Sequence, residues 1–563
     1  MYPRAYSLLL SLALLKAAFA QTPPNPTVQP KTDEETCTVS GTVFRKADGV
    51  PLKNALVQLL MDNDRDHAIA TRSTLDGKFL LQNLPCEKYS MMVSRNGYVT
   101  SKYGQKKPSD PGTRFSLRPG QKMEGLVFYL DRAAVITGRV FDEDGEPMPG
   151  VTVTTLRQGF LQGRKRLWPA AVATTNDLGE YRVYGLQAGR YYLKAEPHTW
   201  GRVVGEKQYS GSEKSAPERA YKGLCYPGTT DLSKASTVQV REAEEAPSID
   251  FLMKEVPVVR LRGRIVSVLP KIGNRNYFDV QVNPRNQLEA SFGWSYSSER
   301  VRSDGSFEVP DVIPGEYTIT ATQFGEDRNS ATQMDLDVGS TDINDLLLVI
   351  GGGFEVHGTV IWEGKPSVEK DGLAVSAVPP GFDFYQGQGG HSSVDKNSQF
   401  VWKDMPEGQY QVDIFGMGKD VYVKEIKAGE NRAEGNVIKL NKGTAEVQIT
   451  LSSRGARLQG MVITEENLPA PGVWTVAIAE NAWIGKRAWA ATTDQNGHYE
   501  LRGLPPGKYK LYSWQDIEES SWDDPDVVKP YEDKGTPIEL QDGDSKTADQ
   551  TLINLKEAAP KGE

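Results

Sequence analysis

The chain has 563 residues, and its 65 Lys and Arg residues against 74 Asp and Glu residues give a formal net charge of −9. This surplus of negative charge excludes nucleic acid and an anionic membrane surface as the main partners, because both are themselves acidic. No apolar run after residue 20 is long enough to cross a bilayer, so no membrane span is expected.

Residues 1–20 are predicted to be a signal peptide. Arg4 supplies the basic start, residues 8–15 the apolar stretch, and Ala18-Phe19-Ala20 the small-residue cleavage site. An ordinary buried helix is the alternative. A signal peptide implies export to the periplasm, the outer surface or the extracellular space. The Pro-rich, polar residues 21–36 are expected to form a flexible linker.

A short strand with a central glycine opens each of five repeats. The five glycines lie 97, 125, 95 and 102 residues apart, which is the size of a sandwich domain rather than of a solenoid repeat. The strands are expected at residues 39–43, 136–140, 261–265, 356–360 and 458–462.

A second motif follows further along each repeat. It is clearest at residues 494–511, which read D-Q-N-G-H-Y-E-L-R-G-L-P-P-G-K-Y-K-L. Tyr499 and Tyr509 each begin an alternation of apolar and polar residues, which predicts two strands with one buried face. Asn496-Gly497 predicts a tight turn, and Gly507 is predicted to take a positive φ in the turn between the strands. The other copies start at Asp76, Asp177, Asp304 and Asp395.

Each repeat offers about seven short strands with turn signals between them, and helical periodicity is nearly absent. The predicted fold class is therefore all-β, a tandem array of about five seven-stranded antiparallel β-sandwich domains. The joints are so short that a semi-rigid rod is expected. The domains are placed at residues 37–131, 132–254 with a loop insertion at 200–245, 255–350, 351–453 and 454–557, before a tail at 558–563.

The chain has three cysteines, Cys37, Cys86 and Cys225. In the first copy of the motif, Cys86 stands where Pro506 stands in the last. A disulfide from Cys37 to Cys86 would hold that turn to the first strand, and export would permit it. Two buried free thiols are the alternative. Cys225 is left without a predicted role.

These motifs resemble carboxypeptidase-regulatory-like domains, which are transthyretin-like sandwiches attached to many secreted proteins. The matching residues are Gly138-Arg139-Val140, the turn at 147–151 and the block at 494–509. The resemblance covers nearly all of residues 37–557 and is stronger in the first, second and fifth repeats. It implies a non-catalytic accessory role. Such domains are also similar to a carbohydrate-binding fold group, although a fold does not fix a function.

No catalytic or metal-binding motif occurs in the sequence. H-E-x-x-H, G-x-S-x-G and phosphate-loop patterns are absent. Residues 62–66 resemble the start of a calcium loop, but His67 stands where that loop needs glycine. A zinc site needs three converging ligands, and the histidines are scattered along the chain, so no enzyme activity, metal or cofactor is expected. The histidines are His67, His198, His357, His391 and His498.

Four tryptophans of the last repeat are candidate ligand-binding residues. Trp483 and Trp489 flank a polar segment, and Trp514 and Trp522 flank an acidic one. Sugar rings stack on flat aromatic faces, which makes a polysaccharide the candidate ligand. The alternative is packing in the core or at a domain joint, because tryptophan is highly buried on average.

Two functions compete at this stage. The first is an exported, non-catalytic multidomain binding or adhesion protein, with a polysaccharide or a cell-envelope protein as its partner. The second is a purely structural stalk or scaffold of the cell envelope. Exposed tryptophans in the last repeat would favour the first, and buried ones the second. An enzyme would need a cleft with converging ionisable groups.

Overall fold

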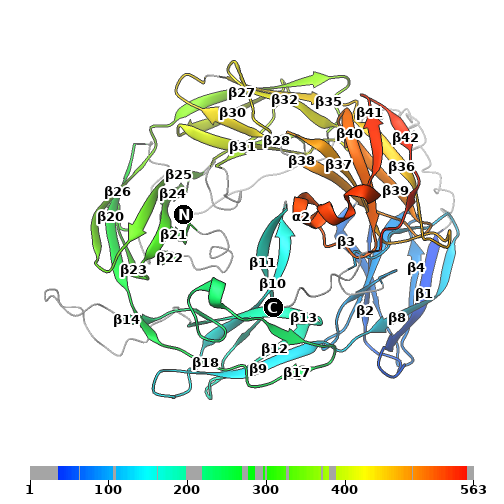
Figure 1. Ribbon diagram of the computed structural model, residues 1–563, viewed down its shortest axis with the longest axis horizontal. Helices are drawn as coiled ribbons and strands as arrows, with labels where there is room; N and C mark the ends of the chain where they lie inside the picture. Colours follow the sequence, from blue (N-terminus) through cyan, green and yellow to red (C-terminus); the bar gives the residue numbers. More distant parts are fainter. Residues whose placement is uncertain are drawn as a thin grey trace, which may run out of the picture.

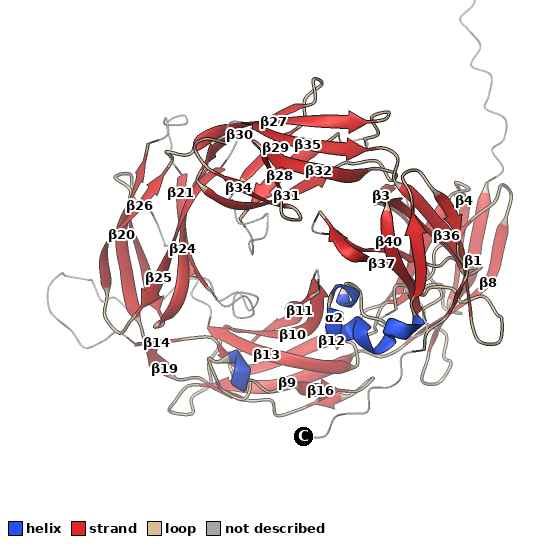
Figure 2. Cartoon of the chain, turned by 45° about the horizontal axis from the view of Figure 1, so that its top comes forward, coloured by secondary structure: helices blue, strands red, loops and turns tan. Residues whose placement is uncertain are grey.

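The computed structural model contains the five predicted sandwiches, and they form a closed ring (Figure 1, Figure 2). We number them units 1 to 5; they run over residues 37–130, 134–257, 259–350, 354–452 and 456–551. The predicted signal peptide and the tail at 558–563 lie outside the described residues. The structure describes residues 36–61, 64–105, 110–161, 163–197, 219–268, 277–285, 296–297, 301–324, 329–368, 372–379, 389–444, 446–484 and 486–554.

Units 1 and 2 each consist of two sheets. The strands of unit 1 are β1 (Cys37–Arg45), β2 (Leu56–Met61), β3 (Asp64–Arg72), β4 (Lys78–Leu84), β5 (Lys88–Ser94), β6 (Ser101–Lys102), β7 (Phe115–Ser116) and β8 (Lys122–Leu130). Those of unit 2 are β9 (Ala134–Phe141), β10 (Val151–Leu161), β11 (Arg164–Thr174), β12 (Glu180–Leu186), β13 (Gly189–Pro197), β14 (Arg219–Tyr221), β15 (Leu224–Cys225), β16 (Val238–Val240), β17 (Glu245–Ala246), β18 (Phe251–Leu252) and β19 (Glu255–Pro257). The sheet orders are β4-β1-β8 and β3-β2-β5-β6 in unit 1, with β7 beside β5. In unit 2 they are β12-β9-β17 and β11-β10-β13-β15, with β18 beside β9 and β16 beside β13.

Units 3 to 5 repeat the two-sheet plan. Unit 3 has β20 (Val259–Ser267), β21 (Tyr277–Pro284), β22 (Tyr296–Ser297), β23 (Ser306–Val312), β24 (Gly315–Phe324), β25 (Asn329–Val338) and β26 (Ile343–Ile350). Unit 4 has β27 (Phe354–Glu363), β28 (Ala374–Val378), β29 (Gly390–Ser393), β30 (Gln399–Met405), β31 (Gly408–Phe415), β32 (Tyr422–Ala428), β33 (Asn431–Arg432), β34 (Val437–Leu440) and β35 (Glu446–Ser452). Unit 5 has β36 (Ala456–Ile463), β37 (Trp474–Trp483), β38 (Lys486–Thr492), β39 (His498–Leu504), β40 (Gly507–Trp514), β41 (Thr536–Leu540), β42 (Ser545–Thr547) and β43 (Gln550–Thr551). The sheet orders are β23-β20-β26 and β22-β21-β24-β25, then β30-β27-β35-β32-β33 and β29-β28-β31-β34, then β39-β36-β42 and β38-β37-β40-β41, with β43 beside β36.

Helical structure is confined to short turns in the described residues. Unit 2 carries η1 (Leu232–Lys234), and the β40–β41 connection of unit 5 carries η3 (Ser521–Asp523), α2 (Pro525–Val528) and η4 (Lys529–Lys534). The all-β sandwich prediction is therefore confirmed.

The units are not wholly antiparallel, because the opening strand of each pairs in parallel with the closing strand. Thus β1 pairs antiparallel with β4 and parallel with β8. The same parallel pairing recurs in the other four units. The closing strand enters the first sheet after the chain has left the second sheet, and it runs in the same direction as the opening strand. The chain therefore enters a unit at one end of the first sheet and leaves at the other end.

The glycine of each opening strand lies beneath an aromatic ring of the neighbouring strand. In unit 1, Gly41 pairs with Phe79, and a Cβ on Gly41 would lie only 2.8 Å from that ring and 2.2 Å from the carbonyl oxygen of Leu126. The two repeated sequence motifs are thus cross-strand partners, with an aromatic ring covering a glycine. The remaining pairs are Gly138–Tyr181, Gly263–Phe307, Gly358–Phe400 and Gly460–Tyr499.

Gly507, in the turn of the second motif, has a positive φ of 158°, as predicted, close to the extended region. The left-handed residue of this turn is Gly503, with a φ of 69°, which the sequence interpretation did not name. In every unit, the residue equivalent to Gly503 has a left-handed backbone. It lies where the pairing between the opening strand and the first strand of the second motif shifts register. Only Gly, Asn and Asp visit this region routinely, and these types occupy all five positions. They are Asn83, Gly185, Asp311, Asp404 and Gly503.

The tyrosine after this turn is buried and tied back to the turn. The hydroxyl of Tyr509 donates to the carbonyl oxygen of Pro505 at 2.6 Å, and its ring lies in the core of unit 5 with 2 % exposure, as predicted. All five units share this bond to the residue four positions earlier, so the motif is a tyrosine corner. The other corner tyrosines are Tyr89, Tyr191, Tyr317 and Tyr410.

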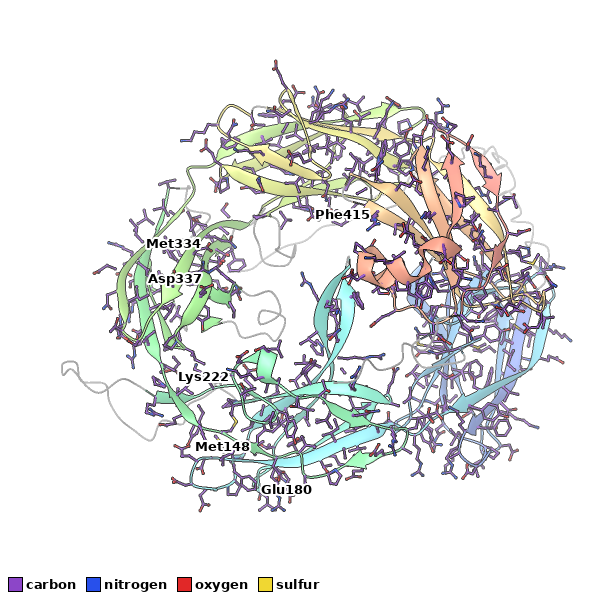
Figure 3. The ribbon with its side chains drawn as sticks, viewed as in Figure 1. Met148, Glu180, Lys222, Met334, Asp337 and Phe415 are labelled. Carbon is purple, nitrogen blue, oxygen red and sulfur yellow. A yellow bond between two sulfur atoms is a disulfide. The ribbon has the colours of Figure 1, made fainter. Side chains whose placement is uncertain are left out.

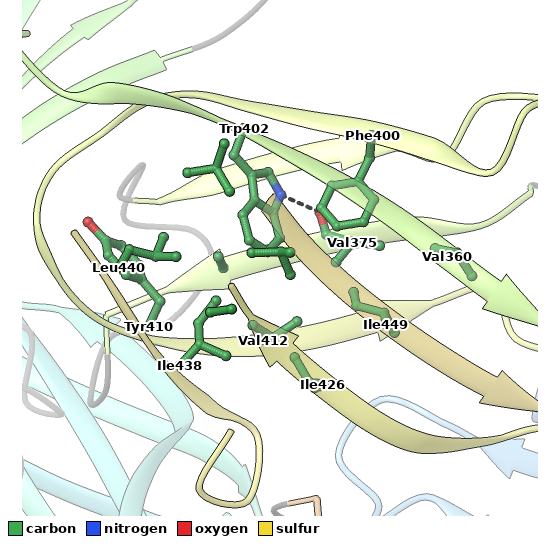
Figure 4. Packing of buried hydrophobic residues seen from close by; sticks show 14 of the residues in the cluster. Val360, Val375, Phe400, Trp402, Tyr410, Val412, Ile426, Ile438, Leu440 and Ile449 are labelled. Carbon is green, nitrogen blue, oxygen red and sulfur yellow. Dashed lines mark hydrogen bonds between the residues drawn. The ribbon is translucent and has the colours of Figure 1, made fainter. Parts of the chain in front are cut away.

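Each unit has its own hydrophobic core between its two sheets. Figure 4 shows the core of unit 4, where Phe400, Tyr410 and Ile449 surround Trp402. The indole N–H of Trp402 donates to the carbonyl oxygen of Val375 at 3.3 Å, so the largest side chain of this core is satisfied within it. Independent cores imply that the units can unfold separately.

The predicted loop at 200–245 is partly wrong. Of that stretch, the described residues 219–245 include β15 and β16, which pair with β13 and extend the second sheet of unit 2. Strand β16 holds the place beside the corner tyrosine that β34 and β41 hold in units 4 and 5. Three residues, V-Q-V, are too few to show an alternating pattern, which is why the sequence did not reveal this strand.

The prediction of a rod is wrong because every unit bends the chain in the same sense. The chain enters and leaves each unit through the first sheet, so all joints lie on the same side of the units. The first sheets face the outside of the ring and the second sheets face its interior (Figure 1, Figure 2). Accordingly, Glu180 of β12 lies at the outer side and Phe415 of β31 at the inner side (Figure 3). Bends in the same sense at successive joints bring unit 5 back to unit 1 (Figure 1).

Candidate binding site at the closure of the ring

Units 1 and 5 are far apart in sequence and meet where the ring closes. Arg114 of unit 1 forms an isolated parallel bridge with Asp494 of unit 5. Beside it, Gly472 faces Thr113, and a Cβ on Gly472 would lie 2.6 Å from the Thr113 hydroxyl oxygen and 3.5 Å from the carbonyl oxygen of Gly112. The loop at 112–114 therefore touches two turns of unit 5.

Both turns of unit 5 are held by local hydrogen bonds. The Asp494 carboxylate accepts the backbone N–H groups of Asn496 at 2.8 Å and His498 at 3.0 Å. The hydroxyl of Thr493 donates to the carbonyl oxygen of Ala470 at 2.7 Å and accepts the N–H of Val473 at 3.0 Å. These bonds fix the surface that unit 5 offers to unit 1.

On the side of unit 1, Thr113 is buried with an unpaired hydroxyl. Its side chain is 4 % exposed, and its oxygen has no hydrogen-bond partner among the described residues. Its backbone N–H donates to the carbonyl oxygen of Tyr103 at 2.7 Å, and the Tyr103 ring stands edge-on to Phe115 with centroids 5.1 Å apart. A buried, unpaired hydroxyl costs about 1–3 kcal/mol, so the closed contact is not fully optimised.

A cavity of about 1240 Å³ separates the two units around this contact. Its walls come from β2, β5, β6 and the 111–114 loop of unit 1, and from β36, β38, β39 and nearby turns of unit 5, with Lys419 of unit 4 at one side. Tyr103 and Trp474 supply half-buried aromatic rings to the lining. The ionisable lining residues are Lys88, Lys102, Arg114, Lys419, Arg457, Arg502, Asp494, His498, Glu500, Glu519 and Asp549.

Most of the carboxylates that line the cavity already have an ion-pair or hydrogen-bond partner within the protein. Glu500 forms an ion pair with Arg457 and lies 3.9 Å from Arg502. The Asp549 carboxylate accepts the backbone N–H of Met461 at 2.9 Å. In contrast, no carboxylate of the described residues lies within 4.0 Å of the ammonium group of Lys102 or Lys419. The cavity therefore has uncompensated positive charge, although the whole chain is acidic.

Arg502 also joins the cavity to unit 4. Its guanidinium donates two hydrogen bonds to the carboxylate of Asp420, one of them at 2.7 Å. The bond from Arg502 holds the pKa of Asp420 below its ordinary value, so this carboxylate stays ionised at neutral pH. Three units thus meet at this edge of the ring.

A second contact crosses the ring. The β10–β11 hairpin of unit 2 extends into the interior toward α2 of unit 5 (Figure 1). At its tip, a Cβ on Gly163 would lie 2.7 Å from the backbone of Asp523, and a Cβ on Gly159 would lie 3.4 Å from a carboxylate oxygen of Glu518. Unit 5 is therefore held by three other units.

The predicted tryptophan face is not present. Trp489, Trp514 and Trp522 are only 7 %, 0 % and 5 % exposed. Trp489 packs on Tyr509 in the core, and Trp514 stacks on Tyr512 at 4.7 Å. Buried rings cannot offer a face to a sugar. The sequence interpretation was wrong because it inferred exposure of these rings from the polar segments beside them.

The fourth candidate, Trp483, lies at the joint between units 4 and 5. Its indole N–H donates to the carbonyl oxygen of Val423 at 2.6 Å, and its ring stands edge-on to Tyr422. This is the joint packing that the sequence left open as an alternative. Trp474 was not singled out from the sequence, yet it lines the cavity. Its position at the start of β37 gave no local sign of this role.

Cys37 and Cys86 form a disulfide with Cα atoms 5.7 Å apart, which ties the first strand of unit 1 to its motif turn. Cys225 is a free thiol with no exposed surface, packed among Leu156, Leu167 and Leu232. Burial raises the pKa of Cys225 to about 12, so the thiol is protonated and unreactive.

The described histidines lie apart from one another. His357 lies 3.0 Å from Glu355, and His498 lies 3.7 Å from Asp494. The side chains of residues 62–67, which include the predicted polar loop, lie outside the described part, as does His198. Within that part, no group of three His, Cys, Asp or Glu residues is placed to hold a metal ion. No helix there is long and apolar enough to span a bilayer.

Comparison with known families identifies the first two units. The family model of the carboxypeptidase regulatory-like domain matches residues 38–130 and 135–205. The chain thus contains carboxypeptidase regulatory-like domains, in unit 1 and in the first part of unit 2. A search of curated proteins found no match.

Several solved bacterial pilins show a distant likeness. The minor pilin GBS52 of Streptococcus agalactiae has 14 % identity and a TM-score of 0.21, with 43 % of this chain and 100 % of that chain covered. A streptococcal ancillary pilin has 11 % identity and a TM-score of 0.18, covering 52 % and 98 %. The shaft pilin SpaA of Lactobacillus rhamnosus GG has 12 % identity and a TM-score of 0.19, covering 40 % and 97 %. Scores this low show no common overall arrangement, and no functional conclusion follows from them.

Proposed function

We propose that this protein is an exported, non-catalytic binding protein whose ligand site is the cavity between units 1 and 5. The observation that carries the proposal is the cavity itself, which the two ends of the folded chain build together. Ligand pockets occur preferentially at domain interfaces, with aromatic and polar groups on their walls. This cavity has both kinds of group.

Export is supported by two independent features. The N-terminal sequence has the pattern of a signal peptide, and Cys37 and Cys86 form a disulfide. Disulfides persist in oxidising compartments such as the periplasm and the extracellular space. A binding role outside the cytoplasm agrees with both.

A binding role also suits the charged groups around the cavity. Asp420, Arg457, Glu500 and Arg502 are held in ion pairs, and the pKa of Asp420 is lowered by its partner. The pair of Asp420 and Arg502 lowers the pKa of the carboxyl and raises that of the guanidinium, so both stay charged and can orient a ligand. Proton transfer, in contrast, needs a pKa shifted toward the working pH.

The proposal is tested by hydrogen exchange of the secreted protein with a panel of envelope polysaccharides and envelope proteins. At least one ligand is expected to slow exchange at residues 112–114 and 490–494, on both walls of the cavity. Protection confined to other units, or none with any member of the panel, would contradict a site at the ring closure.

A purely structural scaffold is the second candidate. It is favoured by the burial of Trp489, Trp514 and Trp522, which the sequence analysis set as the sign of a scaffold. It is also favoured by the joint between units 4 and 5, where backbone, indole and ion-pair contacts hold two units together. A scaffold needs rigid joints but no ligand. It would be supported if the panel gave no protection at any unit and deletion of the protein released other envelope components.

A further inference from the structure

The ligand class can be inferred from the groups on the cavity walls. Resting on the function proposed above, we infer that the cavity binds a carboxylate-bearing polysaccharide, with Lys102 and Lys419 meeting its charges and Tyr103 and Trp474 meeting its sugar rings. The inference depends on the balance of charge, on the placement of the aromatic rings and on the size of the space.

The charge balance favours an anionic ligand. Six Lys and Arg side chains line the cavity against four Asp and Glu side chains. Glu500 is paired with arginine, and the carboxylates of Asp494 and Asp549 accept backbone N–H groups. Lys102 and Lys419 come from units 1 and 4, and the described residues place no carboxylate within 4.0 Å of either ammonium group. A neutral ligand would leave both charges uncompensated.

The aromatic rings are fixed in place before any ligand arrives. Tyr103 is held edge-on against Phe115 at 5.1 Å, and Trp474 packs on Trp522 at 5.0 Å. Each ring is half-buried and borders the cavity. Rigid aromatic surfaces provide contact area at little entropic cost, and the apolar C–H face of a sugar ring can stack on them.

The cavity is larger than a site for one small molecule. Its volume of about 1240 Å³ exceeds the roughly 300–1,000 Å³ of ordinary ligand pockets. A polysaccharide repeats hydroxyls, C–H faces and carboxylates along its length. One chain can therefore reach lysines on different units and both aromatic rings. An acidic peptide also carries charge, but it lacks sugar C–H faces for the rings.

The test measures binding of the secreted protein to three polymers by titration calorimetry. The probes are polygalacturonate, the same polymer with its carboxyls reduced to alcohols, and poly-L-glutamate. Polygalacturonate is expected to bind, more weakly as salt rises. Equal binding of the reduced polymer would overturn the role of charge. Tighter binding of poly-L-glutamate would assign the cavity to an acidic peptide.

Three cavity variants and two control variants locate the binding. Lys102→Gln and Lys419→Gln are each expected to weaken polygalacturonate binding about 2- to 5-fold. Lys403→Gln is the control, because Lys403 is exposed on β30 and lies outside the cavity. Trp474→Leu should weaken polygalacturonate binding but leave any poly-L-glutamate binding unchanged, whereas Trp168→Leu, at an exposed tryptophan of β11, should affect neither. Equal losses in the cavity and control variants would overturn the inference.

The outcome also separates this inference from the function on which it rests. If polygalacturonate fails but another ligand of the panel protects residues 112–114 and 490–494 from exchange, the binding function stands and the acidic-polysaccharide inference is wrong. If no ligand protects these residues, both are wrong.

Discussion

Of the three units that contact unit 5, unit 4 and unit 1 do so in different ways. Against unit 4, the N–H of Gly455 donates to the carbonyl oxygen of Asp420 at 2.9 Å, the indole of Trp483 reaches Val423, and Arg502 pairs with Asp420. Against unit 1, one isolated backbone bridge and a glycine contact border a cavity. Unit 5 thus makes several specific contacts with unit 4 at the joint and only a few with unit 1 at the closure.

The difference follows from how each contact is reached. Units 4 and 5 are covalently joined by three residues, so their surfaces meet at a high effective concentration and can pack closely. Units 1 and 5 meet only after four successive joints have set the curve of the ring. Small interfaces within a chain allow relative motion by default. The proposed ligand site therefore lies at the looser of these two contacts of unit 5.

The largest expected effect comes from unfolding unit 5, which removes its contacts with units 1, 2 and 4 together. Tyr509→Ala removes a buried ring from its core and should lower the stability of unit 5 by about 3–5 kcal/mol. Tyr509→Phe is the matched control; it loses only the bond to Pro505, worth about 1 kcal/mol. Domain-resolved hydrogen exchange should show unit 5 opening first while units 1 to 3 stay protected. Damage spread evenly over the ring would show that the units are not independent.

Loss of the disulfide affects only the side of the closure formed by unit 1. Replacing Cys37 and Cys86 by Ala should lower the stability of unit 1 by about 2–4 kcal/mol, because the unfolded chain regains the freedom of a loop closed across 49 residues. Thermal unfolding with and without dithiothreitol checks this. Reductant should reproduce the effect in the wild type and do nothing further in the variant. An equal response of unit 4 would contradict it.

Gly472 tests the closure against an equivalent turn elsewhere. Gly472→Ala and Gly150→Ala each place a Cβ at positive φ, at 69° and 74°, which costs about 1–2 kcal/mol in either unit. The new Cβ meets Thr113 in the first case and nothing within 4 Å in the second. Small-angle scattering should therefore show a more open ring for Gly472→Ala alone. An identical profile for the two variants would mean that Thr113 does not bear on closure.

Trp483→Phe probes the dense joint. A smaller aromatic ring remains, and the N–H bond to Val423 is lost, which costs about 1 kcal/mol for the bond alone. Hydrogen exchange at residues 420–424 should rise while residues 112–114 stay unchanged. Trp168→Phe, at an exposed tryptophan away from the joint, is the control. A rise at 112–114 instead would indicate that closure depends on this bond.

Acidification is expected to loosen the joint slightly. Arg502 lowers the pKa of Asp420 below its ordinary value of 3.8, so the folded state favours the ionised carboxylate. This stabilisation is present above the ordinary pKa and is lost as the pH falls through the lowered one. Because both side chains are more than one-third exposed, we expect only about 0.2–1 kcal/mol. Arg502→Gln should abolish this part of the pH dependence of unfolding. An unchanged pH dependence would show that the Asp420–Arg502 pair is not its source.

The local elements could be predicted from the sequence because their signals are local. Alternation around Tyr499 and Tyr509 predicted two strands, and both rings are buried. The left-handed turn residue was also within reach, since Gly503 and its four equivalents are all Gly, Asn or Asp. The sequence analysis did not name Gly503, because it assigned the positive φ of this motif to Gly507, which is also a glycine of the motif.

The site could not be predicted in the same way, because it depends on distant pairings. Nothing near Thr113 or Gly472 in the sequence shows that they will meet, since their contact follows from the summed angles of four joints. The tryptophans show the same limit, because polar neighbours of Trp489 and Trp514 suggested exposure. Trp489 is buried in the core between the two sheets, whereas Trp514 is buried on the other face of its sheet, where Ile517, Trp522 and Val528 of the β40–β41 connection pack with it. Such cover by a neighbouring segment leaves no local pattern in the sequence.

The distance between units 1 and 5 in solution tests the closed ring most directly. Spin labels introduced through Lys102→Cys and Glu519→Cys lie on the two walls of the cavity, while Cys225 is buried and the other cysteines form the disulfide. Pulsed electron paramagnetic resonance on the ligand-free protein should give one narrow distribution of short distances. An extended chain of five units would place the labels beyond the range of the method, and the absence of dipolar coupling would contradict the ring.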